Sequence, residues 1–364
     1  MDNKITRSRL SDLLSYEWIA MLVVAIISII VWELGYSMGA VRLTAGQEFK
    51  YYYDSTIMVE DDAQFKSKLL SYNTFSYDVL KLSTEALSEE NYFLGDRLSI
   101  QEGDAIFTDI LGIDEFDEQT QKPKVVRAKS MIDASYKYHI GSLDQMVYDA
   151  KIYLTKNFFV DGVYESQIKD IVEVAEEQKG QLPMLKDLLK SGNTDSEKIL
   201  NSIDDNKVEK MFLKRNKDDN RFRKQSAVKQ GIMAEKARIV KLFENVLYFE
   251  NFIQNNADAL FEYTMYGQTM SFEPNSDQVK AHENAKQKNL NRFGKETEIY
   301  GIKIGQLKHG GEASKVMGLE NPKDPNKVVD GIVLLTFDFI KYQPDLQFES
   351  LSFVCSTIRA FSGE

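Results

Sequence analysis

The sequence predicts a helix-rich α/β protein that begins with a single transmembrane helix. Three observations predict this class. A long apolar run lies near the start of the chain, strand and helix patterns alternate in 47–112 and again after 296, and the intervening 131–292 is helical almost throughout. From these patterns we expect five parts: a cytoplasmic tail at 1–17, a transmembrane helix at 18–41, an α/β lobe at 42–130, a helical section at 131–295, and a C-terminal α/β part at 296–364 that completes the lobe.

The apolar run begins WIAMLVVAIISIIVW, in which Ser28 is the only polar residue, and it continues with Glu33 as its only charge. At about 1.5 Å per residue it is long enough to cross a bilayer core of roughly 30 Å. Trp18 and Trp32 bracket its most apolar part, as amphipathic rings do at membrane interfaces. A helix buried in a soluble core would usually show a polar stripe, and this run shows none.

Basic residues around the run indicate its orientation. Lys4, Arg7 and Arg9 precede it, whereas Arg42 and Lys50 follow it, and the side with more cations is expected to stay inside. No second hydrophobic span follows. We therefore expect a cell-membrane protein with its N-terminus inside and its ectodomain outside.

A cleaved signal peptide is the alternative for this run. Ser37 and Gly39 form a small-x-small pair that a signal peptidase could accept. The apolar run is long for a signal sequence, and the charged Glu33 precedes the pair, so a retained anchor is favoured. A mature N-terminus at Ala40 would contradict the anchor.

Composition narrows the functional classes. The net charge of −11 argues against general nucleic-acid binding, and 43% hydrophobic residues suffice for one large domain or two lobes. Cys355 is the single cysteine, which excludes an internal disulfide. Its place in an apolar helical pattern indicates a small buried side chain rather than a nucleophile.

The first α/β part contains three strand patterns. FKYYY at 49–53 is rich in aromatic residues, YDVLKL occupies 77–82, and AIFT occupies 105–108. Between the first two, Asp61-Asp62 opens a helix whose apolar residues recur at helical spacing. A β-α-β order with a later strand predicts a parallel sheet with right-handed crossovers. The acidic, Pro-containing 113–130 is expected to be a solvated loop.

The helical section contains one long amphipathic helix and a strongly basic stretch. Apolar residues from Ile239 to Leu260 step by three, four or seven, with a break expected at Asn255-Asn256. Residues 207–241 hold twelve basic and four acidic residues and carry a net charge of +8. Two interpretations stay open: a basic face toward anionic lipid, or helix surfaces neutralised by acidic neighbours in the fold.

The C-terminal part returns to strand patterns. EIYGIKI at 298–304 alternates as a half-buried strand should, and GIVLLTF at 331–337 is continuously apolar, which indicates burial on both faces. A last helix with apolar residues from Phe348 to Ile358 is expected to be mostly buried.

No stretch carries a recognisable catalytic or metal-binding pattern. The chain has no G-x-S-x-G elbow, Walker loop or H-E-x-x-H, and His139, His282 and His309 have no ligand-like spacing. The acidic residues of 113–130 lack the glycine and spacing of a calcium loop. We therefore expect no enzyme, no cofactor and no metal. The alternative is a carboxylate-based glycosidase whose two acids meet only in the fold.

The order of elements resembles the extracytoplasmic solute-binding proteins of ABC importers. Several sequence segments also resemble those of a group of membrane-anchored proteins of clostridial bacteria that accompanies sugar-type importers. The segments are YEWI with the run after it, YDVLKLSTEAL, RLSIQEGDAIF, NRFRKQSAVKQGIMAEKARI and DGIVLLTFDFIKYQPDLQFESLSF. The resemblance implies a periplasmic-binding-protein-like ectodomain, a small-molecule solute, and ABC transporter permease subunits as partners beside the lipid bilayer. Two features depart from it, namely the absence of a cysteine before 355 and the almost purely helical 131–292.

A ligand site in such a fold lies off the carboxyl ends of the parallel strands. This rule selects the residues that follow the three expected strands: Asp54, Ser55, Ser83, Thr84, Thr108 and Asp109. Asp338 follows the later strand, and Tyr51 or Tyr53 could stack on a sugar ring. Ordinary turn residues are the alternative for the site, and an anchored scaffold without a small ligand is the alternative for the whole protein. Such a scaffold predicts a filled cleft and an exposed apolar patch on the helices.

Overall fold

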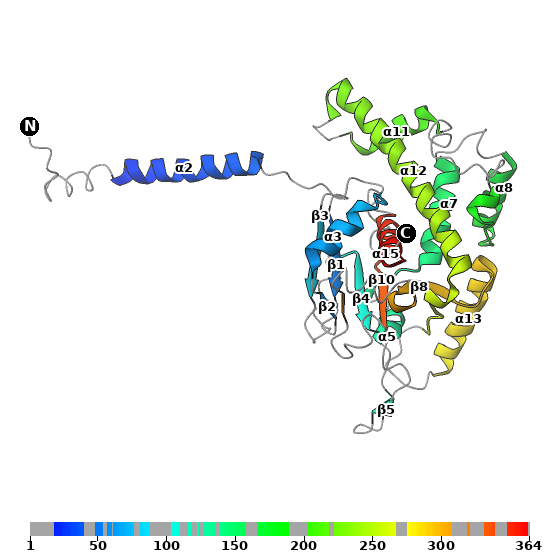
Figure 1. The fold of residues 1–364 in the computed structure, drawn as a ribbon. Helices are drawn as coiled ribbons and strands as arrows, with labels where there is room; N and C mark the ends of the chain where they lie inside the picture. The colour runs from blue at the N-terminus through cyan, green and yellow to red at the C-terminus, as the bar shows by residue number, and fades with distance from the viewer. Residues whose placement is uncertain are drawn as a thin grey trace, which may run out of the picture. The chain divides into compact units, whose positions relative to one another are not determined.

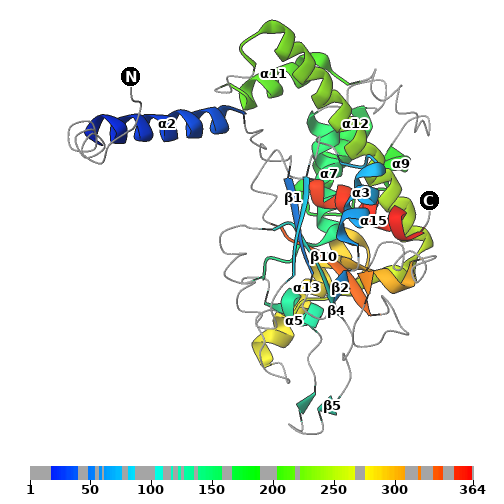
Figure 2. The same ribbon diagram turned by 60° about the vertical axis from the view of Figure 1, so that its left-hand side comes forward.

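The chain forms two compact units, Met1–Thr44 and Ala45–Glu364 (Figures 1 and 2). The computed structural model describes residues 18–39, 48–53, 57–59, 61–75, 81–86, 103–109, 116–117, 122–123, 127–134, 138–157, 166–188, 203–217, 222–266, 275–307, 319–320, 331–338 and 348–362.

The first unit contains helix α2, Trp18–Gly39. Its large apolar side chains between Leu22 and Trp32 are exposed on all sides of the helix. Among the described residues, no helix combines the length and the apolarity that a membrane crossing requires. The transmembrane helix at 18–41 stays a prediction.

Six strands of the second unit form one mixed sheet in the order β3-β1-β4-β10-β8-β7. Their bounds are β1 Glu48–Tyr53, β3 Lys81–Ala86, β4 Ala105–Asp109, β7 Leu260–Tyr263, β8 Glu298–Lys303 and β10 Ile332–Thr336. Strand β1 pairs in parallel with β3 and β4, whereas β10 is antiparallel to β4 and β8, and β7 is antiparallel to β8. The helix-rich α/β class is confirmed, and the expected parallel pairing holds for the three N-terminal strands.

Two short ribbons lie outside this sheet. Strand β2, Met58–Val59, pairs with β9, Leu319–Glu320, and β5, Phe116–Asp117, pairs with β6, Lys122–Pro123. The second ribbon and the start of α5 lie in 113–130. The prediction that this whole stretch is a loop was therefore wrong.

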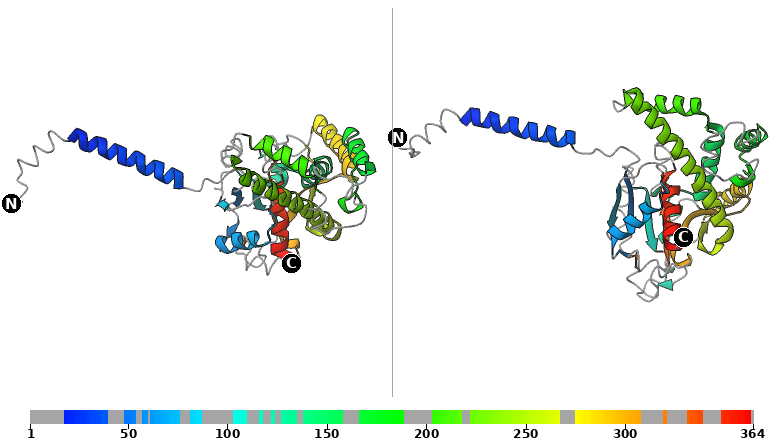
Figure 3. Two further views of the ribbon diagram at one scale, coloured as in Figure 1. Left: turned by 90° about the horizontal axis from the view of Figure 1, so that it is seen from above. Right: turned by 45° about the horizontal axis from the view of Figure 1, so that its top comes forward.

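Helices occupy most of the remaining described chain (Figure 3). They are α3 Asp62–Ser71, α5 Arg127–Asp133, α7 Leu143–Asn157, α8 Ser166–Glu177, α9 Leu185–Leu188, α11 Asp205–Arg215, α12 Gln225–Asn255, α13 Ser276–Phe293 and α15 Glu349–Ser362, with the 3-10 turns η2 Ala257–Ala259 and η3 Ile304–Gln306. Helix α12 ends at Asn255, where a break was expected. Strand β7 follows within the expected helical section, which is therefore not purely helical.

The aromatic strand β1 supplies side chains to both faces of the sheet, because successive residues of a strand point to opposite sides. Phe49, Tyr51 and Tyr53 belong to the main core with α3 and α15. Tyr52 belongs to a second core on the other face, where α5 contributes Met131 and Ile132. The sheet is thus covered by helices on both faces, as strand burial in β10 predicts.

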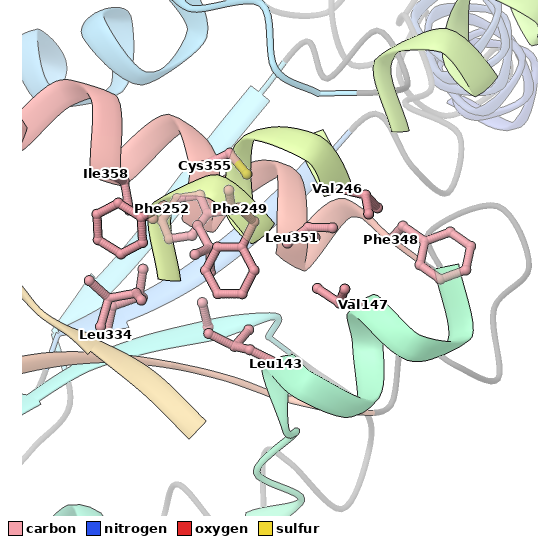
Figure 4. Close-up of a cluster of buried hydrophobic side chains, with 14 of the residues drawn as sticks. Leu143, Val147, Val246, Phe249, Phe252, Leu334, Phe348, Leu351, Cys355 and Ile358 are labelled. Atoms are coloured by element: carbon pink, nitrogen blue, oxygen red, sulfur yellow. The ribbon is translucent and has the colours of Figure 1, made fainter. Parts of the chain in front are cut away.

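Helices α7, α12 and α15 meet over the main core (Figure 4). Figure 4 shows Leu143 of α7 beside Phe249 of α12, and Leu351 of α15 and Leu334 of β10 belong to the same core. Almost every side chain of α15 is buried, which confirms the prediction of a buried last helix. Its Ser356 Oγ donates to the Leu69 carbonyl of α3 at 2.6 Å, and this bond joins the two helices that cover the parallel strands.

Candidate functional site: the carboxyl edge of the parallel strands

The parallel strands β3, β1 and β4 bring their carboxyl ends to one edge of the sheet. Glu48 of β1 pairs with Lys81 and Tyr53 pairs with Ala86, so β1 and β3 end level with each other. Tyr53 also pairs with Phe107 of β4, and β4 extends two residues further, to Asp109. In chain order, β3 follows β1 and lies on one side of it, and β4 comes next and lies on the other side of β1. The strand order therefore reverses at β1, and a topological switch point lies between β1 and β4.

The predicted site residues fall at different places relative to this edge. Asp54 and Ser55 lie outside the described residues. Thr108 is buried within β4 opposite Val333, and Asp109 ends that strand opposite Ile332.

Ser83 and Thr84 lie inside β3 rather than after it, opposite Lys50 and Tyr51. Ser83 Oγ donates to Glu48 Oε1 at 3.0 Å, at the start of β1. Strand β3 runs on to Ala86, so the expected end at Leu82 was too early.

Asp62 gathers a polar cluster at the helix side of these strands. Asp61 caps α3 by accepting from the Gln64 N–H at 2.9 Å, and this cap places Asp62 in the first turn. Thr84 Oγ1 donates to Asp62 Oδ2 at 2.9 Å, and Lys66 forms an ion pair with the same oxygen. We call Asp62, Thr84, Lys66 and Tyr51 the Asp62 cluster.

Tyrosine hydroxyls of β1 extend the Asp62 cluster inward. Tyr51 Oη donates to Asp62 Oδ1 at 3.4 Å, and Tyr53 Oη donates to Tyr51 Oη at 3.4 Å. Burial raises the pKa of both phenols above the ordinary value, so both are neutral donors at pH 7. Sequence reasoning found Asp62 only as a helix start, because its contact with Thr84 depends on the pairing of β1 with β3.

The rings of Tyr51 and Tyr53 do not face a ligand. Their exposed fractions are 0% and 4%, and Tyr53 stacks on Phe107 with centroids 5.5 Å apart. Phe353 of α15 covers Tyr51 at 5.0 Å. The hypothesis that either ring stacks on a sugar was wrong, because the closing helix already occupies that side of β1.

Asp338 lies at the opposite edge of the sheet. Strand β10 is antiparallel to β4, with Ile332 beside Asp109 and Thr336 beside Ala105, so its carboxyl end lies where β4 begins. There the Phe337 N–H donates to the Asp104 carbonyl at 3.0 Å. Asp338 is therefore not part of the carboxyl edge of the parallel strands.

Asp104 is the most strongly perturbed carboxyl of that opposite edge. The Lys50 N–H donates to its Oδ2 at 2.7 Å, and its own N–H donates to the Lys50 carbonyl at 2.7 Å. Burial raises the pKa of Asp104 to about 7, with a smaller contribution from the nearby Glu349 and a lowering from the Lys50 N–H bond. These two hydrogen bonds join β1 to the start of β4. They give the buried Asp104 carboxyl a structural role that needs no ligand.

The histidines and the cysteine form no shared centre in the described chain. His139 Nδ1 lies 3.7 Å from Asp338 Oδ1, while His282 stacks on Tyr266 with ring centroids 3.7 Å apart. His309 lies outside the described residues. Burial raises the pKa of the Cys355 thiol to about 12, which fits an inert core side chain. Across the described residues, no group of three His, Cys, Asp or Glu side chains could hold a metal ion.

Comparisons with known proteins add no relative. No family model matches the chain, no curated protein matches it, and no solved structure matches it.

Proposed function

We propose that this chain is a single-pass, membrane-anchored module of the extracytoplasmic solute-binding type, which presents a small solute to the permease subunits of an ABC importer. One observation carries the proposal: three adjacent parallel strands change order at β1 and so create a switch point between the ends of β1 and β4. Open α/β sheets bind ligands at such points. Thr108 and Asp109 end one of the two strands, and Asp54 and Ser55 follow the other in the sequence.

The chemistry of the Asp62 cluster favours a hydroxyl-rich ligand of the sugar type. It presents a carboxylate acceptor and a threonine hydroxyl that can both donate and accept. Lys66 adds a donor beside them.

Ligand-dependent thermal unfolding of the full chain in detergent tests solute binding. A ligand present at 100 times its Kd should raise the free energy of unfolding by about 2.7 kcal/mol. The panel comprises sugars, amino acids and short peptides. A melting temperature that stays constant across all three classes would contradict solute binding.

Point variants then locate the site within the sheet. Asp62→Asn and Thr84→Val should remove the ligand-induced shift. Ser83→Ala is the matched control, because Ser83 is the neighbour of Thr84 on β3 and its hydroxyl bonds to Glu48 of β1 instead of Asp62. Equal loss of the shift in all three variants would place the ligand elsewhere.

The composition of α2 supports the anchor. Apolar side chains surround it, and Trp18 and Trp32 flank its most apolar part. Carbonate extraction of membranes from cells that express the full chain tests this, together with protease treatment from outside. Release of the chain by carbonate would contradict a membrane-spanning α2, whatever the solute assay shows.

An anchored scaffold is the second candidate, and two observations favour it. Tyr51 and Tyr53 are covered by the closing helix, and Ile171 and Val174 lie exposed one turn apart on α8. Co-purification from membranes separates the two functions. Permease subunits as partners favour solute delivery, whereas an unrelated membrane protein with a ligand-independent melting temperature favours the scaffold.

A further inference from the structure

The described part of the basic segment 207–241 belongs to α11, to the start of α12 and to the turns beside them, and ten of its twelve cations fall into two groups. Four are bound to polar side chains of the fold: Arg215 and Arg238 to Glu235, Lys236 to Asp205, and Lys241 to Asn73. Six are exposed, and their side chains form no ion pair or hydrogen bond with any residue that the structure describes: Lys210, Lys214, Lys217, Arg223, Lys224 and Lys229. Acidic and polar side chains of the fold therefore bind only some of the positive charges of this segment.

Three of the six exposed cations lie on α11 or directly after it. Lys210 and Lys214 lie one turn apart on α11, Leu213 lies beside them with 45% of its surface exposed, and Lys217 lies in the turn after the helix. We call these four residues the α11 outer face. The opposite side of the helix buries Phe212 against α12.

Contacts with α12 hold α11 in place. A Cβ atom at Gly231 of α12 would lie 2.1 Å from the Phe212 ring, so the two helices are in close contact there. Phe222 packs edge-on against Phe212 with centroids 4.8 Å apart. Arg215 forms two bonds to the buried Glu235, at 3.1 and 2.6 Å, and closes the same contact.

We propose that the α11 outer face binds the surface of an anionic lipid bilayer. Lysines along one helix side, with an apolar residue among them, are typical of helices that lie at a lipid headgroup layer. Lysine is a point charge without the planar fork that arginine uses for bidentate recognition, which suits a fluid layer of phosphates better than a defined carboxylate site. The net charge of −11 for the whole chain opposes general attraction to polyanions and leaves this face as a local exception.

A fluorescent label at Leu213→Cys tests the proposal in the full chain. The native Cys355 is buried and should not react. The chain is reconstituted with phosphatidylcholine vesicles, with or without phosphatidylglycerol, that carry headgroup nitroxide lipids. We expect quenching of the label in anionic vesicles only, and its loss at high salt because salt screens exposed charges. A label at Met233→Cys, two residues from Gly231 and so on the far side of α12, should stay unquenched.

Charge variants assign the effect to the lysines. Each lysine near an anionic surface contributes roughly fivefold, so K210Q/K214Q/K217Q should lower the equilibrium constant for the bound face about 100-fold. The matched control is K179Q/K280Q/K288Q, which removes three exposed lysines, one from the turn after α8 and two from α13, and should change nothing. Quenching that is equal in neutral and anionic vesicles, or unchanged in the first variant, overturns the proposal. Loss of an acidic protein partner in that variant, without lipid-dependent quenching, would also overturn it.

Discussion

The ion pair between Lys151 of α7 and Glu250 of α12 offers a quantitative test of how the helical section is held together. Lys151 Nζ lies 2.9 Å from Glu250 Oε1, and the two side chains are only 8% and 3% exposed. Lys151 also donates to the Pro183 carbonyl at 2.9 Å, while the Leu185 N–H donates to Glu250 Oε2 at 2.6 Å. The pair therefore joins α7, α12 and the start of α9.

Removal of either partner leaves the other charge buried with a single hydrogen-bond partner. Breaking a buried pair in this way costs about 3–5 kcal/mol, so Lys151→Met and Glu250→Leu should each lower the free energy of unfolding by that amount. The double variant replaces both charges by apolar groups of similar volume. It removes the partners of the Leu185 N–H and of the Pro183 carbonyl, at a cost of about 1–3 kcal/mol for each group left unbonded. We expect the double variant to be several kcal/mol more stable than the sum of the single effects predicts.

Urea unfolding of the four chains at pH 7 measures this coupling as a double-mutant cycle. The comparison is valid if the free energy of unfolding depends on urea concentration with the same slope in all four chains. Equal slopes show that the variants change stability and not the surface exposed on unfolding. Lys186→Met is a suitable control, because the Lys186 side chain donates to Gln254 at an exposed site. Single effects that add within about 0.5 kcal/mol would refute the reasoning, since a buried pair cannot behave as two independent charges.

Three further predictions concern other contacts. Gly231→Ala should lower the free energy of unfolding by about 1–3 kcal/mol in a urea titration, because its Cβ would overlap the Phe212 ring; an unchanged midpoint would contradict the close contact. Phe353→Ala should cost about 3–5 kcal/mol, since this buried ring contacts the aromatic side chains of β1, and a loss below about 1 kcal/mol would show that α15 is loosely packed. The pKa of Asp104 is raised from an ordinary 3.8 to about 7, so its contribution to stability is full below pH 3.8 and is lost as the pH rises to about 7. Thermal melts between pH 4 and 8 should show this decline in the native chain and not in Asp104→Asn; parallel curves would contradict the burial of the carboxyl.

The elements with strong local signals were predictable, and their partners were not. The aromatic β1, the helix start at Asp61-Asp62 and the apolar β10 follow from spacing and composition within short windows. The direction of β10 depends on a pairing with β4 across most of the globular unit, and an apolar run carries no information about its direction.

The same limit applies to the site and to the charges. The contact between Thr84 and Asp62 arises only when β3 pairs with β1, so no local pattern could reveal it. The basic segment showed its net charge in the sequence. The packing of α11 against α12 decides which of these cations pair with Glu235 and which stay exposed, and the sequence does not show this packing.

The position of β10 between β4 and β8 has a consequence for synthesis. A ribosome makes β1, β3 and β4 first, and their sheet then presents an open edge along β4 until Ile332–Thr336 emerges. Helix α15, which covers the aromatic side of β1, is made later still. Nascent chains should therefore pass through a stage with an unpaired strand and bare aromatic surface, which is where chaperones bind and where premature termination would lead to aggregation.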